Sequence, residues 1–111
     1  MKKSLFTSLI AASAIMVSLV SCVSVEKAAP PVALLSSVPS SKAKPQLEDG
    51  RCIYVGQCTK CHSPEPIVKH DVADWNDDIL PTMTKKAKLT PEECEALKAY
   101  VLAVCKQTQT S

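Results

Sequence analysis

Two cysteines and a histidine stand within five consecutive residues, in the sequence Cys58-Thr59-Lys60-Cys61-His62. Thiols three positions apart lie about one helical turn from each other, and the imidazole follows the second thiol directly. Two such thiols can each add to a vinyl group of a porphyrin, which leaves the adjacent imidazole to bind the iron. This C-x-x-C-H motif predicts one covalently bound haem c, with thioethers at Cys58 and Cys61 and with His62 as the proximal iron ligand.

Other chemistries use the same residue types. A redox-active C-x-x-C usually belongs to a βαβ domain, but no segment of this sequence alternates well enough for a strand. A structural zinc site usually has a second close pair of ligands, whereas Cys94 and Cys105 are eleven positions apart. Zinc, or a cofactor-free lipoprotein braced by disulfides, stays open as an alternative.

The remaining cysteines of the folded part are Cys52, Cys94 and Cys105. On one continuous helix Cys94 and Cys105 would be about 16 Å apart, too far for a disulfide. Only Cys52 can pair with one of them in an oxidising compartment, and the alternative is that all three are unbridged.

The first 21 residues have the composition of an export signal. A short basic start, "MKK", precedes an apolar run without charges, as in the n-region and h-region of a secretory signal. The run ends in "LVSC", which resembles a bacterial lipobox. We therefore expect a lipoprotein signal peptide at 1–21, lipidation of Cys22, and a membrane-anchored protein that faces the periplasm or the cell exterior. An ordinary cleaved signal or an uncleaved anchor is the alternative.

Residues 22–45 are rich in Ala, Ser, Val and Pro and contain no aromatic residue. We interpret them as the lipidated N-terminus and a tether that does not pack. Residues 46–111 form the folded domain. A domain of this size usually depends on a disulfide, a metal or a cofactor.

Three helices are expected in the domain, the first at about Leu47–Cys58. A short helix at Asp74–Leu80 would be capped by Asp74 and ended by Pro81, after a segment that is mostly loop. The last helix, Pro91–Lys106, begins with the capping box of "TPEE" at 90–93. Its apolar stripe has helical spacing and consists of Leu97, Tyr100, Val101 and Val104.

Residues 47–105 resemble a small class I, monohaem cytochrome c. That family has a glycine eight residues and an aromatic four residues before the first haem cysteine, matched here by Gly50 and Tyr54. It packs them against an aliphatic and an aromatic residue on the last helix, matched by Leu97 and Tyr100. The resemblance implies an all-α domain of three to four short helices wrapped around the haem.

The resemblance also implies further haem contacts. The sixth iron ligand is usually a methionine, and Met83 lies fourteen residues before Leu97, the family's interval. His70 is the rival ligand. Trp75, Tyr54 and Leu97 would pack against the haem. Pro64 or Pro66 would supply the backbone prop for the Nδ1 proton of His62.

These features favour a single-electron carrier. Without Lys2 and Lys3, 11 of the 13 basic residues remain, against 11 acidic residues, so no basic field favours nucleic acid. No acid–base pair marks an enzyme. We expect a monomer that passes electrons between larger redox proteins or respiratory complexes, with Lys85, Lys86 and Lys88 steering acidic partners. A haem sensor with an open sixth site is the alternative function.

We predict that Cys22 is the first mature residue and carries lipid. Two or more acyl chains anchor a protein durably, whereas one chain binds a membrane only marginally. Mass spectrometry of the native protein should find a diacylglyceryl-cysteine at its N-terminus. Cys22→Ala should release the protein from membranes, and the control Cys52→Ala should not. A soluble native protein that begins at another residue would contradict this prediction.

Overall fold

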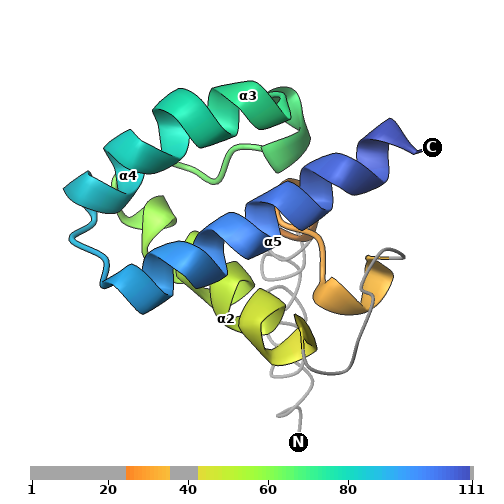
Figure 1. Cartoon of the computed structure of the whole chain (residues 1–111), viewed down its shortest axis with the longest axis horizontal. Coiled ribbons are helices and arrows are strands. Elements are labelled where there is room, and N and C mark those ends of the chain that lie inside the picture. The colour runs from red at the N-terminus through yellow and green to blue at the C-terminus, as the bar shows by residue number, and fades with distance from the viewer. Residues whose placement is uncertain (1–24, 36–42, 111) are drawn as a thin grey trace, which may run out of the picture.

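The computed structural model describes residues 25–35 and 43–110. These residues form helices and connecting loops without strands, which confirms the all-α expectation for the described part. In chain order, the elements are η1 (Val32–Leu34), α2 (Ala43–Gly56), η2 (Cys58–Lys60), η3 (Ile67–Lys69), α3 (Val72–Asp74), η4 (Trp75–Ile79), α4 (Leu80–Lys86) and α5 (Pro91–Gln109) (Figure 1). The expected signal peptide and Cys22 lie outside the described residues, among which no helix is long and apolar enough to cross a bilayer.

The centre of the fold is the crossing of α2 and α5. Gly50 is buried on α2, where a Cβ atom would overlap the carbonyl oxygen of Ala96 and lie 2.7 Å from Cβ of Tyr100. Only a glycine permits this approach, because the neighbouring atoms belong to the backbone and the base of a side chain. The expected contact between Gly50 and Tyr100 is therefore confirmed.

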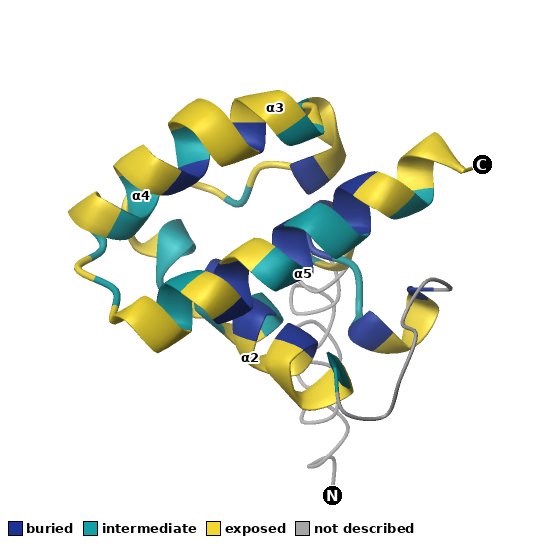
Figure 2. Cartoon of the chain, in the orientation of Figure 1, coloured by how far each residue is buried: buried dark blue, intermediate teal, exposed yellow. Residues whose placement is uncertain are grey.

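Apolar side chains of both helices form the core around this crossing (Figure 2). Leu47, Gly50 and Tyr54 are buried on one face of α2. The predicted stripe of α5 is also buried, and the exposed fractions are 1% for Leu97, 0% for Tyr100, 0% for Val101 and 2% for Val104. Helical spacing predicted this face because residues three and four apart share one side of a helix.

The predicted start of α5 is confirmed in atomic detail. The Thr90 side chain accepts a hydrogen bond from the Glu93 backbone N–H at 3.2 Å, and the Glu93 carboxylate accepts one from the Thr90 N–H at 2.8 Å. These two bonds satisfy donors that a helix start otherwise leaves unpaired. The helix continues to Gln109, three residues beyond the expected end.

Two predictions for the middle helix are wrong. Asp71, not Asp74, caps it, because the Asp71 carboxylate accepts a hydrogen bond from the Asp74 N–H at 2.8 Å. Pro81 does not end it: α3, the π-helical turn η4 and α4 follow one another up to Lys86. In a regular helix a proline ring clashes with the carbonyl four residues before it, and the wider π-turn ahead of Pro81 accommodates the ring.

The first helix differs at its end. Helix α2 ends at Gly56 rather than Cys58, so Cys58 begins the separate 3-10 helix η2. The loop expected after His62 is present but contains the 3-10 turn η3.

The expectation of an unpacked tether is wrong for residues 28–35. Ala28, Ala29, Val32 and Leu35 are buried, and all but Ala28 belong to the core cluster. Few apolar residues are enough here because they meet a surface already formed by α2 and α5. The packed domain therefore begins well before residue 46.

We predict opposite effects for alanine at the two glycines of α2. Gly50→Ala forces the α2–α5 crossing apart and should lower the free energy of unfolding by about 1–3 kcal/mol. Gly56→Ala is the control, because nothing lies within 4 Å of its added Cβ. It should leave stability unchanged or raise it by up to about 1 kcal/mol. Urea denaturation of the full chain measures both, and equal stability of the two variants would contradict the close-contact role of Gly50.

Candidate functional site

A cavity of about 560 Å³ lies beside the α2–α5 crossing. One wall is the segment that follows α2, and the other comes from η4 and α4. The cavity is lined by Tyr54, Cys58, Thr59, His62, Ser63, Pro64, Glu65, Pro66, His70, Trp75, Ile79, Leu80, Met83 and Leu97. Its volume is in the usual range for small-molecule and cofactor sites.

The structure brings together six of the seven residues that the sequence assigned to haem binding. The lining contains Tyr54, Cys58, His62, Trp75, Met83 and Leu97, which come from five separate elements and one loop. Cys61 is exposed and does not line the cavity, whereas Cys58 and His62 of the same motif do.

The two motif cysteines belong to one tight turn. Cys58 begins η2, and Cys61 follows its last residue with helical backbone angles. The two motif cysteines are therefore one turn apart, although only Cys58 lines the cavity. Burial raises the pKa of the Cys58 thiol, and the nearby Cys61 raises it further. Both effects favour the neutral thiol over the thiolate at Cys58.

The backbone carbonyl of the next residue orients the His62 ring. Its Nδ1 atom lies 2.8 Å from the carbonyl oxygen of Ser63. A carbonyl can only accept, so Nδ1 carries the proton and Nε2 keeps a lone pair that can bind a metal. The expected backbone prop is thus present, but it comes from Ser63 rather than from Pro64 or Pro66.

Two aromatic side chains close the inner end of the cavity. The Tyr54 hydroxyl donates to the Glu65 carbonyl, and the Trp75 indole N–H donates to the Ile67 carbonyl at 2.8 Å. The two rings meet edge to face with centroids 6.3 Å apart. Burial raises the pKa of Tyr54 far above its ordinary range, and the nearby Cys58 and Glu65 raise it further. Both rings therefore present apolar faces with their polar atoms satisfied.

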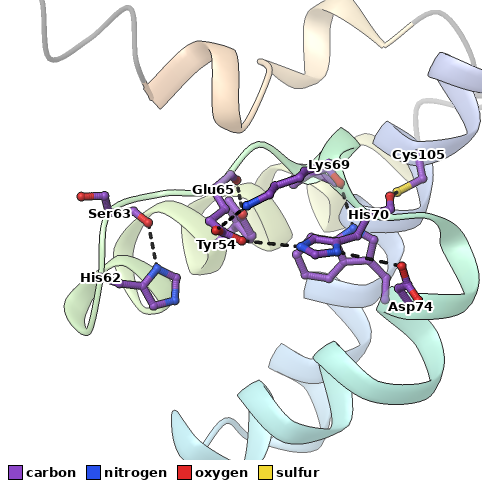
Figure 3. Close-up of polar contacts among 10 residues, drawn as sticks. Tyr54, His62, Ser63, Glu65, Lys69, His70, Asp74 and Cys105 are labelled. Atoms are coloured by element: carbon purple, nitrogen blue, oxygen red, sulfur yellow. Dashed lines mark hydrogen bonds and ion pairs between the residues drawn. The ribbon is translucent and has the colours of Figure 1, made fainter.

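His70 lies in a different environment from His62 (Figure 3). Its ring packs edge to face on Trp75 with a centroid distance of 5.8 Å. Nε2 is 3.6 Å from a Glu65 carboxylate oxygen and Nδ1 is 3.9 Å from an Asp74 carboxylate oxygen. Figure 3 shows His62 and His70 on opposite sides of Tyr54 and Glu65.

The Glu65 carboxylate connects His70 to Lys69. Lys69 Nζ lies 3.0 Å from Glu65 Oε1, and this hydrogen bond and charge lower the Glu65 pKa, with a smaller contribution from His70. His70 therefore faces the carboxylates of Glu65 and Asp74, whereas the Met83 side chain makes no hydrogen bond in the described part of the chain.

All five cysteines in the described residues are free, so neither Cys94 nor Cys105 is bridged to Cys52.

Within residues 25–35 and 43–110, no group of three or more His, Cys, Asp or Glu side chains could hold a metal ion. A haem iron needs fewer protein ligands, because the porphyrin supplies four nitrogens.

Several lining residues were not predicted. Ile79 and Leu80 belong to the π-turn and the start of α4, where the 3.6-residue period fails as a guide to the buried face. Glu65 contributes its carbonyl oxygen to Tyr54, a contact between residues eleven positions apart that no local pattern indicates.

No protein-family model, curated protein or solved structure matches this chain. The function therefore has to be inferred from the residues themselves. Their arrangement provides the Cys58 thiol, an imidazole with a free Nε2 and a thioether around one largely apolar cavity, while the Cys61 thiol lies outside its lining.

Proposed function

We propose that this protein is an exported, lipid-anchored monohaem cytochrome c that carries single electrons between larger redox partners. The observation that carries the proposal is the meeting of Cys58 and His62 of the C-x-x-C-H motif, Met83 and the apolar side chains at one cavity. The lining residues Tyr54 and Leu97 are 43 positions apart in the sequence, so the convergence does not follow from the motif alone.

The residues present fit a covalent haem. Cys58 and Cys61 would hold it through thioethers, and His62 Nε2 and the Met83 sulfur would bind the iron. The bound haem supplies a one-electron couple between ferric and ferrous iron. The protein's part is to hold the group, to exclude water and to set the potential.

The chain's own groups are suited to those tasks. The hydrogen bond to the Ser63 carbonyl fixes the orientation of the His62 ring. Tyr54, Trp75 and Leu97 keep water from one end of the cavity, with exposed fractions of 5%, 5% and 1%. Met83 brings a soft sulfur, which favours ferrous iron and raises the potential relative to a second imidazole.

Met83 is a better candidate than His70 for the sixth ligand. To bind iron, His70 would have to leave Glu65, Asp74 and the edge-to-face contact with Trp75. Met83 has no such interactions to lose in the described residues. The geometry therefore supports one histidine and one methionine.

Exposed lysines border the site and suit an acidic partner. Lys85 and Lys86 end α4, two and three residues after Met83, and Lys88 lies in the following turn with a φ of 53°. All three are exposed. Their charges would accelerate encounter with an acidic protein surface at low ionic strength and would be screened by salt.

We predict that the haem is covalently attached. Protein from a host with haem-attachment machinery should keep its colour through acid-acetone extraction and denaturing electrophoresis. The double variant Cys58→Ala with Cys61→Ala should lose it, because both thioethers are gone. Cys52→Ala, which removes an exposed thiol of α2, is the control and should stay coloured. A colourless wild-type protein under these conditions rules out the cytochrome proposal.

We predict that Met83 binds the iron. Met83→Ala should abolish the weak far-red band of methionine-ligated ferric haem, open a site for carbon monoxide and lower the reduction potential. His70→Ala should change the spectrum very little. A silent Met83→Ala together with a disturbed His70→Ala would instead make this a bis-histidine protein. Carbon monoxide binding by the wild-type protein would indicate an open site and favour the sensor function.

A further inference from the structure

Residues 28–35 form a segment that we name the N-terminal strap. Ala29 and Val32 are 0% and 2% exposed, and Leu35 is 6% exposed. Between them, Ala33 and Leu34 are exposed. This alternation around the 3-10 turn η1 directs one side of the strap into the core and the other to solvent.

Side chains of α2 and α5 bind the backbone of the strap at three points. Arg51 Nε donates to the Ala29 carbonyl at 3.1 Å. The Tyr100 hydroxyl donates to the Pro30 carbonyl at 2.8 Å, and Gln107 Nε2 donates to the Leu34 carbonyl at 3.1 Å. Two helices therefore fix both ends of the strap.

The strap and the cavity occupy different regions of the α2–α5 pair. Figure 1 shows η1 beside the C-terminal half of α5, while η2 and α4 lie toward the other end of that helix. The contacts agree, because Gln107 is near the end of α5 and the cavity residue Leu97 is near its beginning. A molecule that approaches the cavity need not displace the strap.

We propose that the strap shortens the connection between the lipid anchor and the domain and gives the domain one preferred orientation on the membrane. This inference rests on the proposed lipidation of Cys22. Ala28 follows Cys22 by only six positions, so the docked domain lies within about 20 Å of the anchor. A loose connection up to residue 46 would reach about 80 Å when extended.

The consequence concerns the redox partner. A short, fixed connection holds the cavity at a nearly constant height above the bilayer, away from the attachment point. Such confinement raises the effective concentration toward a membrane-bound partner whose docking surface is at a matching height. A freely swinging domain would spread the same molecule over a much larger volume.

The first test measures docking by hydrogen exchange of the full-length protein. The amides of Leu34 and Leu35 donate to Pro31 and Val32 at 3.0 Å each. They should exchange at least about tenfold more slowly than in an unstructured peptide. Val32→Asp puts a charge into the core and should abolish this protection, whereas Ala33→Asp adds the same charge on the exposed side and should not.

Val32→Ala is the second variant, because it shortens the buried side chain without adding a charge. It should reduce the protection of these amides while the amides of α5 keep theirs. Unprotected strap amides in the wild-type protein overturn the proposal. So does equal protection in all three variants.

The second test measures height on the membrane. The native lipoprotein is placed in phosphatidylcholine vesicles that carry a fluorescent headgroup, which the haem quenches by energy transfer. Quenching should be similar in the wild type and Ala33→Asp and weaker in Val32→Asp. Equal quenching in all three overturns the short connection.

The outcomes separate this inference from the proposed function. A colourless protein contradicts the cytochrome, yet strap exchange can still be measured on it. A native protein without N-terminal lipid overturns the short connection to the membrane and leaves the docking result intact.

Discussion

The close contact of α2 with α5 at Gly50 is the constraint on which the rest of the structure depends. Because the Ala96 carbonyl oxygen lies where a Cβ of residue 50 would be, any side chain at this position would force the two helices apart. This contact places Tyr54, one turn further along α2, and Leu97, the residue after Ala96, at the same cavity. Gly50 does not line the cavity, but its close contact with α5 determines where the cavity lies.

The backbone carbonyls of the loop after the C-x-x-C-H motif accept hydrogen bonds from side chains around the cavity. The carbonyls of Ser63, Glu65 and Ile67 accept from His62, Tyr54 and Trp75, three of the four ring side chains around the cavity that carry a polar hydrogen. These acceptors are alternate residues, separated by Pro64 and Pro66. Proline has no N–H of its own and biases the preceding residue to extended backbone. The two prolines therefore keep the loop from forming a regular α-helix, and its carbonyls accept from side chains. The Ile67 carbonyl also accepts the His70 N–H at 3.4 Å in the turn η3.

This loop also shows what sequence can and cannot reveal. The motif, the Thr90 capping box and the α5 stripe were predictable because their signals are local and lie within one or two helical turns. Sequence could not show that Asp71 rather than Asp74 caps the middle helix, since two equivalent aspartates stand three residues apart. Continuation through Pro81 depends on a π-turn, which has no reliable sequence signal.

The strap was missed for a different reason. Its few apolar residues cannot form a core alone, and its composition resembles that of a disordered linker. The groups that hold it come from far along the chain: Arg51 is 22 residues from Ala29, and Tyr100 is 70 residues from Pro30. The strap packs only because α2 and α5 together form a surface for it. Local composition therefore could not predict that this segment is packed.

The strap and the cavity meet the same pair of helices at neighbouring residues. Leu97 lines the cavity, and Tyr100, one turn later on α5, contacts Gly50 and donates its hydroxyl to the strap. A group that fills the cavity holds α2 and α5 together at Tyr54 and Leu97, while the docked strap holds them at Arg51 and Tyr100. Each stabilises the crossing that the other requires, and linkage makes such an effect reciprocal. In a domain this small, a group bound in the cavity and the docked strap would therefore stabilise one core rather than two independent sites.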